Sequence, residues 1–112
     1  MTIYISLPIT GYDLDERKRV AEAARHCLHL DPDAFVVTPF DIAEGVEMMN
    51  PQADYADFMK EDIAYIIDKA EAVCFLVNPR LTKSKGVQLE YQAARIYGKK
   101  IMRLIGGKVI VQ

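Results

Sequence analysis

The sequence predicts an α/β fold, a doubly wound parallel sheet of the flavodoxin-like or Rossmann-like kind, with four to five strands flanked by helices. Short apolar segments rich in β-branched residues alternate with helical segments of roughly 10 to 17 residues. The apolar run at 72–77 (AVCFLV) is typical of a strand covered on both faces. The length of 112 residues suits one core, so we expect a single domain over residues 1–112 with right-handed crossovers.

The elements are expected in a regular order. TIYISL at 2–7 is predicted to be a strand that ends at Pro8, and apolar residues at helical spacing predict a helix over 14–30. The later segments are a strand (34–39), a long irregular connection interpreted as a functional loop (40–52), a helix (54–69), a central strand (71–77), a basic loop (78–85), a helix ended by Gly98 (86–97) and two strands separated by two glycines (100–105 and 108–111).

Composition and charge narrow the class of partner. The formal net charge of −2 argues against a nucleic-acid binder and favours a small-molecule ligand. The N-terminus has no basic segment of a signal peptide, and no apolar run approaches the ~18 residues that span a bilayer. We therefore expect a cytoplasmic protein without a membrane partner. A chain this short is expected to complete a deep cleft by association, as a homodimer or homotetramer.

No metal or cofactor is expected. Cys27 and Cys74 are far apart in sequence and are interpreted as buried thiols. His26 and His29 have the i, i+3 spacing of metal ligands but lack nearby carboxylates, so we assign them no role.

Ligands of open parallel sheets bind beyond the carboxyl ends of the strands, near the point where the strand order reverses. This rule brings together the segments SLPITG, TPFD and NPRLTKSKG. The substrate contacts expected at this edge are Tyr4, Ser6, Pro8, Ile9, Arg17, Asp41, Ser84 and Gly86.

Two carboxylates occupy helix positions that should face the core. Asp62 falls within the apolar stripe of the helix over 54–69, and Glu90 falls on the sheet-facing side of the helix over 86–97. Burial without a partner costs a carboxylate several kcal/mol, so an inward Glu is either paired with a base or used in catalysis. For Glu90 the structural alternative is a salt bridge to Arg95, Lys83 or Lys85.

The segment SKG before the last helix favours an anion. Ser84 and Gly86 stand at a helix N-terminus, where free backbone N–H groups can bind a phosphate, and Ser84 is equally suited to cap the helix. Arg17 and Arg19, just after the first loop, are cations that could reach the same edge, although the alternative is that both are simply solvated.

Four segments in order carry a family resemblance: YISLPITG, VVTPFD, YADFMKEDIAYIIDKAEAVCFL and SKGVQLEYQAARIYGKKI. Together they resemble the nucleoside 2-deoxyribosyltransferase superfamily, in particular a short branch common in bacteria and phages, over about residues 4–101. The resemblance implies that Glu90 attacks C1′ of a sugar and forms a glycosyl-enzyme intermediate, with Asp62 orienting or protonating the leaving base.

The position six residues before the nucleophile suggests which reaction occurs. It tends to be acidic in the transferases, whereas the related deoxynucleotide N-hydrolases have a phosphate-binding serine there; this chain has Ser84. We therefore expect hydrolysis of the N-glycosidic bond of a (deoxy)nucleoside 5′-monophosphate. The alternatives are 2-deoxyribosyl transfer between bases, a non-catalytic nucleotide-binding or sensing module, and a structural protein whose carboxylates are satisfied internally. The sequence leaves the base and sugar open.

Overall fold

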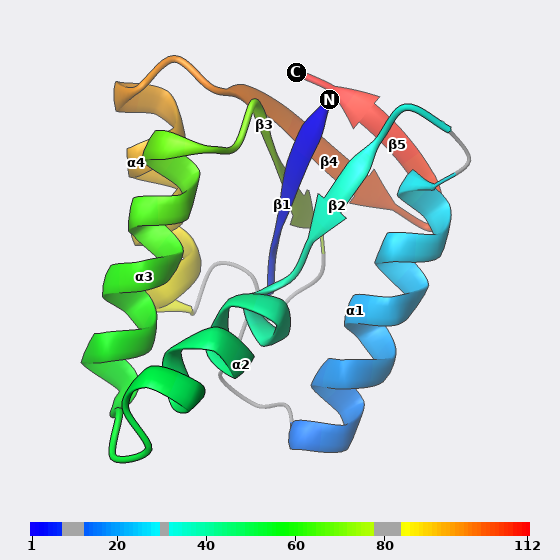
Figure 1. The fold of residues 1–112 in the computed structure, drawn as a ribbon. Coiled ribbons are helices and arrows are strands. Elements are labelled where there is room, and N and C mark those ends of the chain that lie inside the picture. The colour runs from blue at the N-terminus through cyan, green and yellow to red at the C-terminus, as the bar shows by residue number, and fades with distance from the viewer. Residues whose placement is uncertain (8–12, 30–31, 78–83) are drawn as a thin grey trace.

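The computed structural model describes residues 1–7, 13–29, 32–77 and 84–112. Helices and strands alternate over much of the chain (Figure 1). The elements are β1 (Thr2–Ser6), α1 (Leu14–Leu28), β2 (Phe35–Val37), α2 (Pro39–Met49), α3 (Tyr55–Asp68), β3 (Ala72–Leu76), α4 (Lys85–Ile96), β4 (Lys100–Ile105) and β5 (Lys108–Val111).

The five strands form one mostly parallel sheet in the order β2-β1-β3-β4-β5. β1 pairs in parallel with both β2 and β3, and β3 pairs in parallel with β4. β3 is central, as expected, and all five of its residues are buried. The strand order reverses between β1 and β3, because the chain adds β2 on one side of β1 and the later strands on the other. The carboxyl ends of β1 and β3 therefore lie nearest the site described below.

The last strand corrects the expectation of a parallel sheet, because β5 runs antiparallel to β4. Gly106 and Gly107 connect the two strands with φ angles of 53° and 82°. A two-residue connection with positive φ at both positions makes a hairpin, whereas a parallel neighbour needs a crossover of a dozen or more residues.

Helices cover both faces of the sheet (Figure 1). One core cluster joins α1 residues such as Ala24 and Leu28 to Ile3, Ile5 and Cys74 of the sheet. The other joins the opposite side chains of the strands to α3 and α4, among them Val73, Phe75, Ile66 and Ala94. The mixed α/β architecture of a sheet between helices is thus confirmed.

The segment 40–52 corrects the prediction of an irregular loop, because most of it forms helix α2. Thr38 is the N-cap, Pro39 begins the helix, and Asp41 completes a capping box by accepting a 2.9 Å hydrogen bond from the Thr38 backbone N–H. This signature of helix initiation was present in the sequence TPFD. α2 buries none of its residues completely, so it lacks the pronounced apolar stripe from which helices are inferred.

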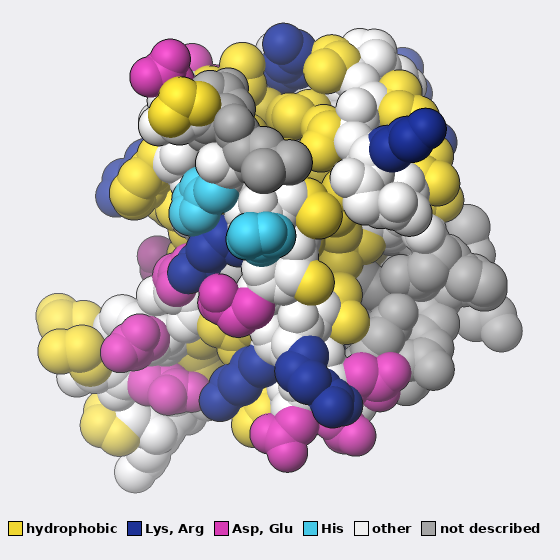
Figure 2. Space-filling model, turned by 90° about the vertical axis from the view of Figure 1, so that its right-hand side faces the viewer, with side chains coloured by type: hydrophobic (Ala, Val, Ile, Leu, Met, Phe, Trp, Pro, Cys, Tyr) yellow, Lys and Arg dark blue, Asp and Glu magenta, His cyan; other side chains and the backbone are white. Residues whose placement is uncertain are grey.

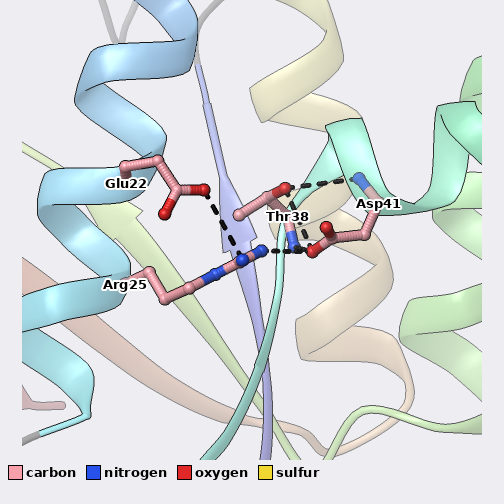
Figure 3. A network of polar contacts seen from close by, with 4 residues as sticks. All are labelled: Glu22, Arg25, Thr38 and Asp41. Carbon is pink, nitrogen blue, oxygen red and sulfur yellow. Dashed lines mark hydrogen bonds and ion pairs between the residues drawn. The ribbon is translucent and has the colours of Figure 1, made fainter.

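An ion pair fixes the start of α2 to α1. Arg25 of α1 reaches Asp41 with one guanidinium nitrogen and approaches Glu22 at 3.5 Å with the other (Figure 3). The Asp41 carboxylate thus accepts a hydrogen bond from the Thr38 N–H and forms an ion pair with Arg25. α2 is held across the end of the sheet where β1 and β2 finish (Figure 1).

The other helices end close to the expected positions. α1 ends at Leu28 with His29 as its C-cap, before the expected end at residue 30, which lies outside the described residues. α3 is capped by Asp54 and Lys69, the ends of the predicted segment. Gly98 follows the C-cap Tyr97 with a φ of 66°, as expected of a glycine that ends a helix. Within the described residues, no helix has both the length and the apolar character to cross a bilayer.

Candidate active site

A cavity of about 270 Å³ lies at the carboxyl end of β1, between α2 and the N-terminal parts of α1, α3 and α4. Both β1 and β3 end on this side of the sheet, where their order reverses. The walls combine apolar and aromatic side chains with a few polar groups, which is the usual character of a small-molecule site. The lining residues are Tyr4, Leu7, Leu14, Arg17, Pro39, Phe40, Ala43, Glu47, Tyr55, Phe58, Met59, Asp62, Gly86 and Glu90.

Glu90 is the most deeply buried carboxylate of the cavity, with 3% of its surface exposed. The N-cap Ser84 starts α4 so that Glu90 shares the inward face of the helix with Val87 and Ala94. Ser6, the last residue of β1, donates a hydrogen bond of 3.1 Å from its hydroxyl to Glu90 Oε1. Glu90 Oε2 is buried and has no hydrogen-bond partner. A buried carboxylate oxygen without a partner is costly and requires an explanation.

Asp62 enters the same cavity from α3 and is 7% exposed. It follows the buried face of the helix, one turn before Ile66, as the apolar stripe predicted. Neither Asp62 nor Glu90 forms an ion pair with any residue that the structure describes. The salt bridges from Glu90 to Lys85 and Arg95 that the sequence left open are absent, while Lys83 lies outside the described residues.

Burial raises the pKa of both carboxyl groups. It brings the pKa of Glu90 to about 8, opposed by the nearby Tyr4 hydroxyl, raised further by the charge of Asp62, and opposed by the hydrogen bond from Ser6. Burial likewise raises the pKa of Asp62 to about 7, opposed by Tyr4 and reinforced by the charge of Glu61. Repulsion between two carboxylates is mutual, so the pair loses its protons in two coupled steps around neutral pH.

The Tyr4 side chain is completely buried and its hydroxyl faces the carboxyl pair. Burial, followed by the charges of Glu90 and Asp62, holds the pKa of Tyr4 well above its ordinary value, so the hydroxyl keeps its proton. No contact of the hydroxyl has full hydrogen-bond geometry. Tyr4 is thus a permanent donor placed to stabilise whichever carboxyl group is ionised.

Gly86 allows close packing between α3 and α4 at the cavity wall. A Cβ atom at this position would lie 3.0 Å from Tyr55 Oη and 3.3 Å from Met59 Sδ. Burial, followed by the charges of Glu90 and Asp62, raises the pKa of Tyr55. The Tyr55 hydroxyl therefore lies close enough to sense the carboxyl pair. Gly86 lines the cavity, and a larger residue at this position would press against two side chains of α3.

Arg17 lines the cavity from the first turns of α1, as expected. Its Nε atom is buried and has no hydrogen-bond partner. Arg19, two residues further along the helix, is exposed and is not part of the cavity wall.

The remaining predicted contacts have different outcomes. Ser84 is buried as the N-cap of α4, and its hydroxyl accepts a 3.3 Å hydrogen bond from the Val87 N–H. Asp41 does not line this cavity, and its carboxylate is engaged by the capping box and by Arg25. Pro8 and Ile9 lie outside the described residues.

Sequence reasoning missed the cavity wall that α2 provides. Pro39, Phe40, Ala43 and Glu47 line the cavity at helical spacing from a segment that had been interpreted as a loop. A reading of Thr38 to Asp41 as a capping box would have found this helix. From α3, the wall residues Tyr55, Phe58, Met59 and Asp62 also follow a helical repeat, but only Asp62 stood out because it is charged.

A larger groove of about 730 Å³ lies on the outer side between α2 and α3. Its wall includes Asp41, Asp57, Lys60 and Tyr65, most of them only partly buried. None of the described residues that line it has a buried polar atom without a partner. In contrast, Tyr4, Arg17 and Glu90, which line the cavity of about 270 Å³, each have a buried polar atom without a partner. We therefore take the smaller cavity as the candidate active site.

The described residues contain no group of three or more His, Cys, Asp or Glu side chains arranged to hold a metal ion. Figure 2 shows the α1 side of the molecule, where the two histidines lie near a mixture of acidic and basic side chains. Cys74 is a buried free thiol, as expected, whereas Cys27 is only partly buried.

The fold and the cavity define an α/β protein with a buried carboxyl pair at a cavity beyond the end of β1. Residues 1–103 match the family described as a domain of unknown function (DUF4406), and the chain belongs to this family. No curated protein and no solved structure gave a significant match. The description of the family names no activity, so the function must be argued from the site.

Proposed function

We propose that this protein hydrolyses the N-glycosidic bond of a (deoxy)nucleoside 5′-monophosphate, with Glu90 as nucleophile and Asp62 as acid and base. The observation that carries the proposal is the buried carboxyl pair, with the unpartnered Glu90 Oε2 at the cavity. Burying two carboxyl groups in an apolar cavity wall costs free energy and perturbs their pKa values. Such perturbed groups are concentrated at catalytic sites. The resemblance to the nucleoside 2-deoxyribosyltransferase superfamily supports the same assignment.

In the first step, ionised Glu90 forms a bond from Oε2 to C1′ of the sugar. The bond between C1′ and the base nitrogen breaks, its electron pair stays on the base, and protonated Asp62 donates the proton that the base requires. The products are the free base and an ester between the sugar and Glu90. Ser6 and Tyr4 assist by donating towards the Glu90 carboxylate and keeping part of it ionised.

In the second step, water replaces the enzyme at C1′. Asp62, now ionised, takes a proton from the water, whose oxygen bonds to C1′ while the ester bond to Glu90 breaks. Glu90 leaves as a carboxylate and Asp62 is protonated again, so the site returns to its starting state. The pair holds one proton between the pKa values of about 7 for Asp62 and about 8 for Glu90. Because Glu90 has the higher pKa, that proton lies mainly on Glu90, and the productive form with Asp62 protonated is the minor one, which donation from Ser6 to Glu90 favours.

We infer that the fold is of the doubly wound, flavodoxin-like kind. The strand order β2-β1-β3-β4-β5 and the helices on both faces support this, although the antiparallel β5 departs from an all-parallel sheet. In such folds the reversal of strand order produces a crevice for ligands. The position of the cavity at the ends of β1 and β3 agrees with that rule.

We expect a cytoplasmic enzyme that associates as a homodimer or homotetramer. The support for association is apolar surface near α2: Met48 is 80% exposed, Met49 is 88% exposed and Phe35 of the edge strand is 63% exposed. Exposed apolar groups of this size are typical of contact surfaces.

Base release from deoxynucleoside and ribonucleoside 5′-monophosphates, followed by chromatography, tests the proposal. The parent should release free base and sugar phosphate, and Glu90→Gln should abolish the reaction while keeping the side-chain volume. Glu44→Gln is the matched control, because it removes an exposed carboxylate of α2 outside the cavity wall. Release that persists in Glu90→Gln would contradict the proposal.

Two further outcomes would replace hydrolysis by an alternative. If an added second base diverts the product from free sugar to a new nucleotide, the protein is a transferase. If nucleotides bind tightly and no base is released from any of them, the protein is a binding module.

A further inference from the structure

Arg17 places a charged donor at the wall of the candidate active site. Its Nε atom is buried and has no hydrogen-bond partner among the described residues, and α1 contributes Arg17 and Leu14 to the cavity wall. A buried donor that lacks an acceptor costs free energy, so each such group in a folded protein requires an explanation. A ligand that brings a hydrogen-bond acceptor into the cavity would explain the unpartnered Nε atom of Arg17.

Arg25, two turns later on the same helix, shows what a structural arginine does in this fold. Its Nε is buried without a partner, as in Arg17, but its terminal nitrogens are paired with Glu22 and Asp41 and fix α2 against α1 (Figure 3). Arg17 forms no ion pair and no side-chain hydrogen bond with the residues that the structure describes. A role in holding helices together through ion pairs therefore explains Arg25 but not Arg17.

The other candidate position for an anion, the N-terminus of α4, is partly occupied. The Ser84 hydroxyl caps the helix and already accepts a hydrogen bond from the Val87 N–H. The carboxyl pair from α3 and α4 repels an anion from its own part of the cavity when ionised. The Arg17 guanidinium, which comes from α1 and has an unpartnered Nε, is better suited to take the negative group.

We infer that Arg17 binds the anionic group of the substrate and makes the site selective for a nucleoside 5′-monophosphate over the nucleoside. This inference rests on the proposed function and names the residue that sets its substrate class. A guanidinium offers two parallel donors that match a phosphate, which a neutral nucleoside cannot use. With the phosphate bound at Arg17, Glu90 and Asp62 act on the bond between the sugar and the base.

The test compares kcat/KM for dAMP, dGMP, dCMP and dTMP with kcat/KM for the corresponding nucleosides. In Arg17→Gln, kcat/KM should fall about 10- to 100-fold for the monophosphates, the loss expected for hydrogen bonds to a charged group, and stay within about twofold for the nucleosides. Arg17→Lys should recover part of the preference because it restores the charge. Arg19→Gln removes an exposed cation from the same helix and should change neither substrate class.

Equal losses for both substrate classes in Arg17→Gln, or an unchanged preference for monophosphates, would overturn the inference. A preference lost in Ser84→Ala and kept in Arg17→Gln would move the anion to α4 and overturn it as well.

Calorimetric titration separates this inference from the proposed function. If the parent releases no base from any of these compounds, the proposed function fails, and the same monophosphates and nucleosides are titrated into the parent and Arg17→Gln. Tighter binding of monophosphates by the parent, lost in Arg17→Gln, would support the role of Arg17. Equal affinities in the two proteins would overturn it.

Discussion

The hydroxyl of Ser6 donates a 3.1 Å hydrogen bond to Glu90 Oε1 and joins the end of β1 to a helix 84 residues further along the chain. Glu90 lines the cavity, and its other carboxylate oxygen, Oε2, is buried without a hydrogen-bond partner. The bond from Ser6 favours the ionised form of Glu90, because a donor to a carboxylate lowers its pKa. The nucleophile of the proposed reaction is therefore positioned and partly ionised by the first strand.

Ser6→Ala is expected to weaken the reaction mainly on the acidic side. Loss of the donor raises the pKa of Glu90, so the acidic limb of the pH dependence of kcat/KM should move to higher pH, by up to about one unit for a hydrogen bond to a charged group. Tyr4→Phe should move the limb in the same direction, because Tyr4 also lowers the pKa of Glu90. An acidic limb at the parent's position in both variants would show that neither donor acts on the nucleophile.

The parent enzyme should have a narrow, bell-shaped pH dependence of kcat/KM, highest between the apparent pKa values of about 7 and about 8 of the pair. The productive form holds one proton, so activity falls when both groups are protonated or both are ionised. Asp62→Asn should lower kcat and also remove the alkaline limb, because only Glu90 then titrates. An alkaline limb that persists in Asp62→Asn would assign that limb to another group.

Glu90→Gln should stabilise the fold while abolishing activity. The folded pKa of Glu90 is raised to about 8, so the native state holds a proton that the unfolded chain has lost above its ordinary pKa near 4. Stability is therefore lost as pH rises from about 4 through about 8, and the variant escapes this loss.

The difference in the free energy of unfolding between Glu90→Gln and the parent should grow steadily as the pH rises from 5 to 8. Urea unfolding at pH 5 and pH 8 measures it. Glu44→Gln serves again as the control, with no growth expected. A Glu90→Gln variant that is less stable than the parent at pH 8 would show that the buried carboxylate is satisfied in the native state.

Asp41→Ala is expected to affect stability and leave the chemistry intact. The substitution removes the capping box of α2 and the partner of Arg25, and loss of a helix cap costs about 1 kcal/mol. Thr38→Ala, which removes the other half of the capping box, should give a similar loss. Urea unfolding gives the stability and base release gives the activity. A large loss of kcat/KM at unchanged stability would return Asp41 to the substrate site.

Where the sequence was informative, a single physical cause dominated. The alternation of β-branched runs and helical repeats predicted the layers, because each element has an apolar face to bury. Asp62 and Glu90 were identified as anomalies because a charge in an apolar stripe is costly. Gly98 was predicted to end a helix and Gly106 and Gly107 to separate two strands, but the antiparallel pairing that a two-residue connection imposes on those strands was not predicted.

Where the sequence was misread, several weak preferences competed. α2 has no fully buried residue, so its hydrophobic pattern was faint and its capping box was the stronger signal. Asp41 was interpreted as a ligand contact because it follows a strand, but nothing local shows that Arg25 lies opposite. The crowding at Gly86 depends on the approach of Tyr55 and Met59 from another helix, which is a tertiary property.

The central claim is that Glu90 becomes covalently linked to the sugar, and trapping of this ester tests it most directly. The parent is mixed with the monophosphate that it hydrolyses fastest, quenched in acid within one turnover and measured by intact-protein and peptide mass spectrometry. The account predicts an increase by the mass of one sugar-phosphate residue on the peptide that contains Glu90, absent in Glu90→Gln. Full base release during the first turnover without any adduct, or an adduct on another residue, would contradict it.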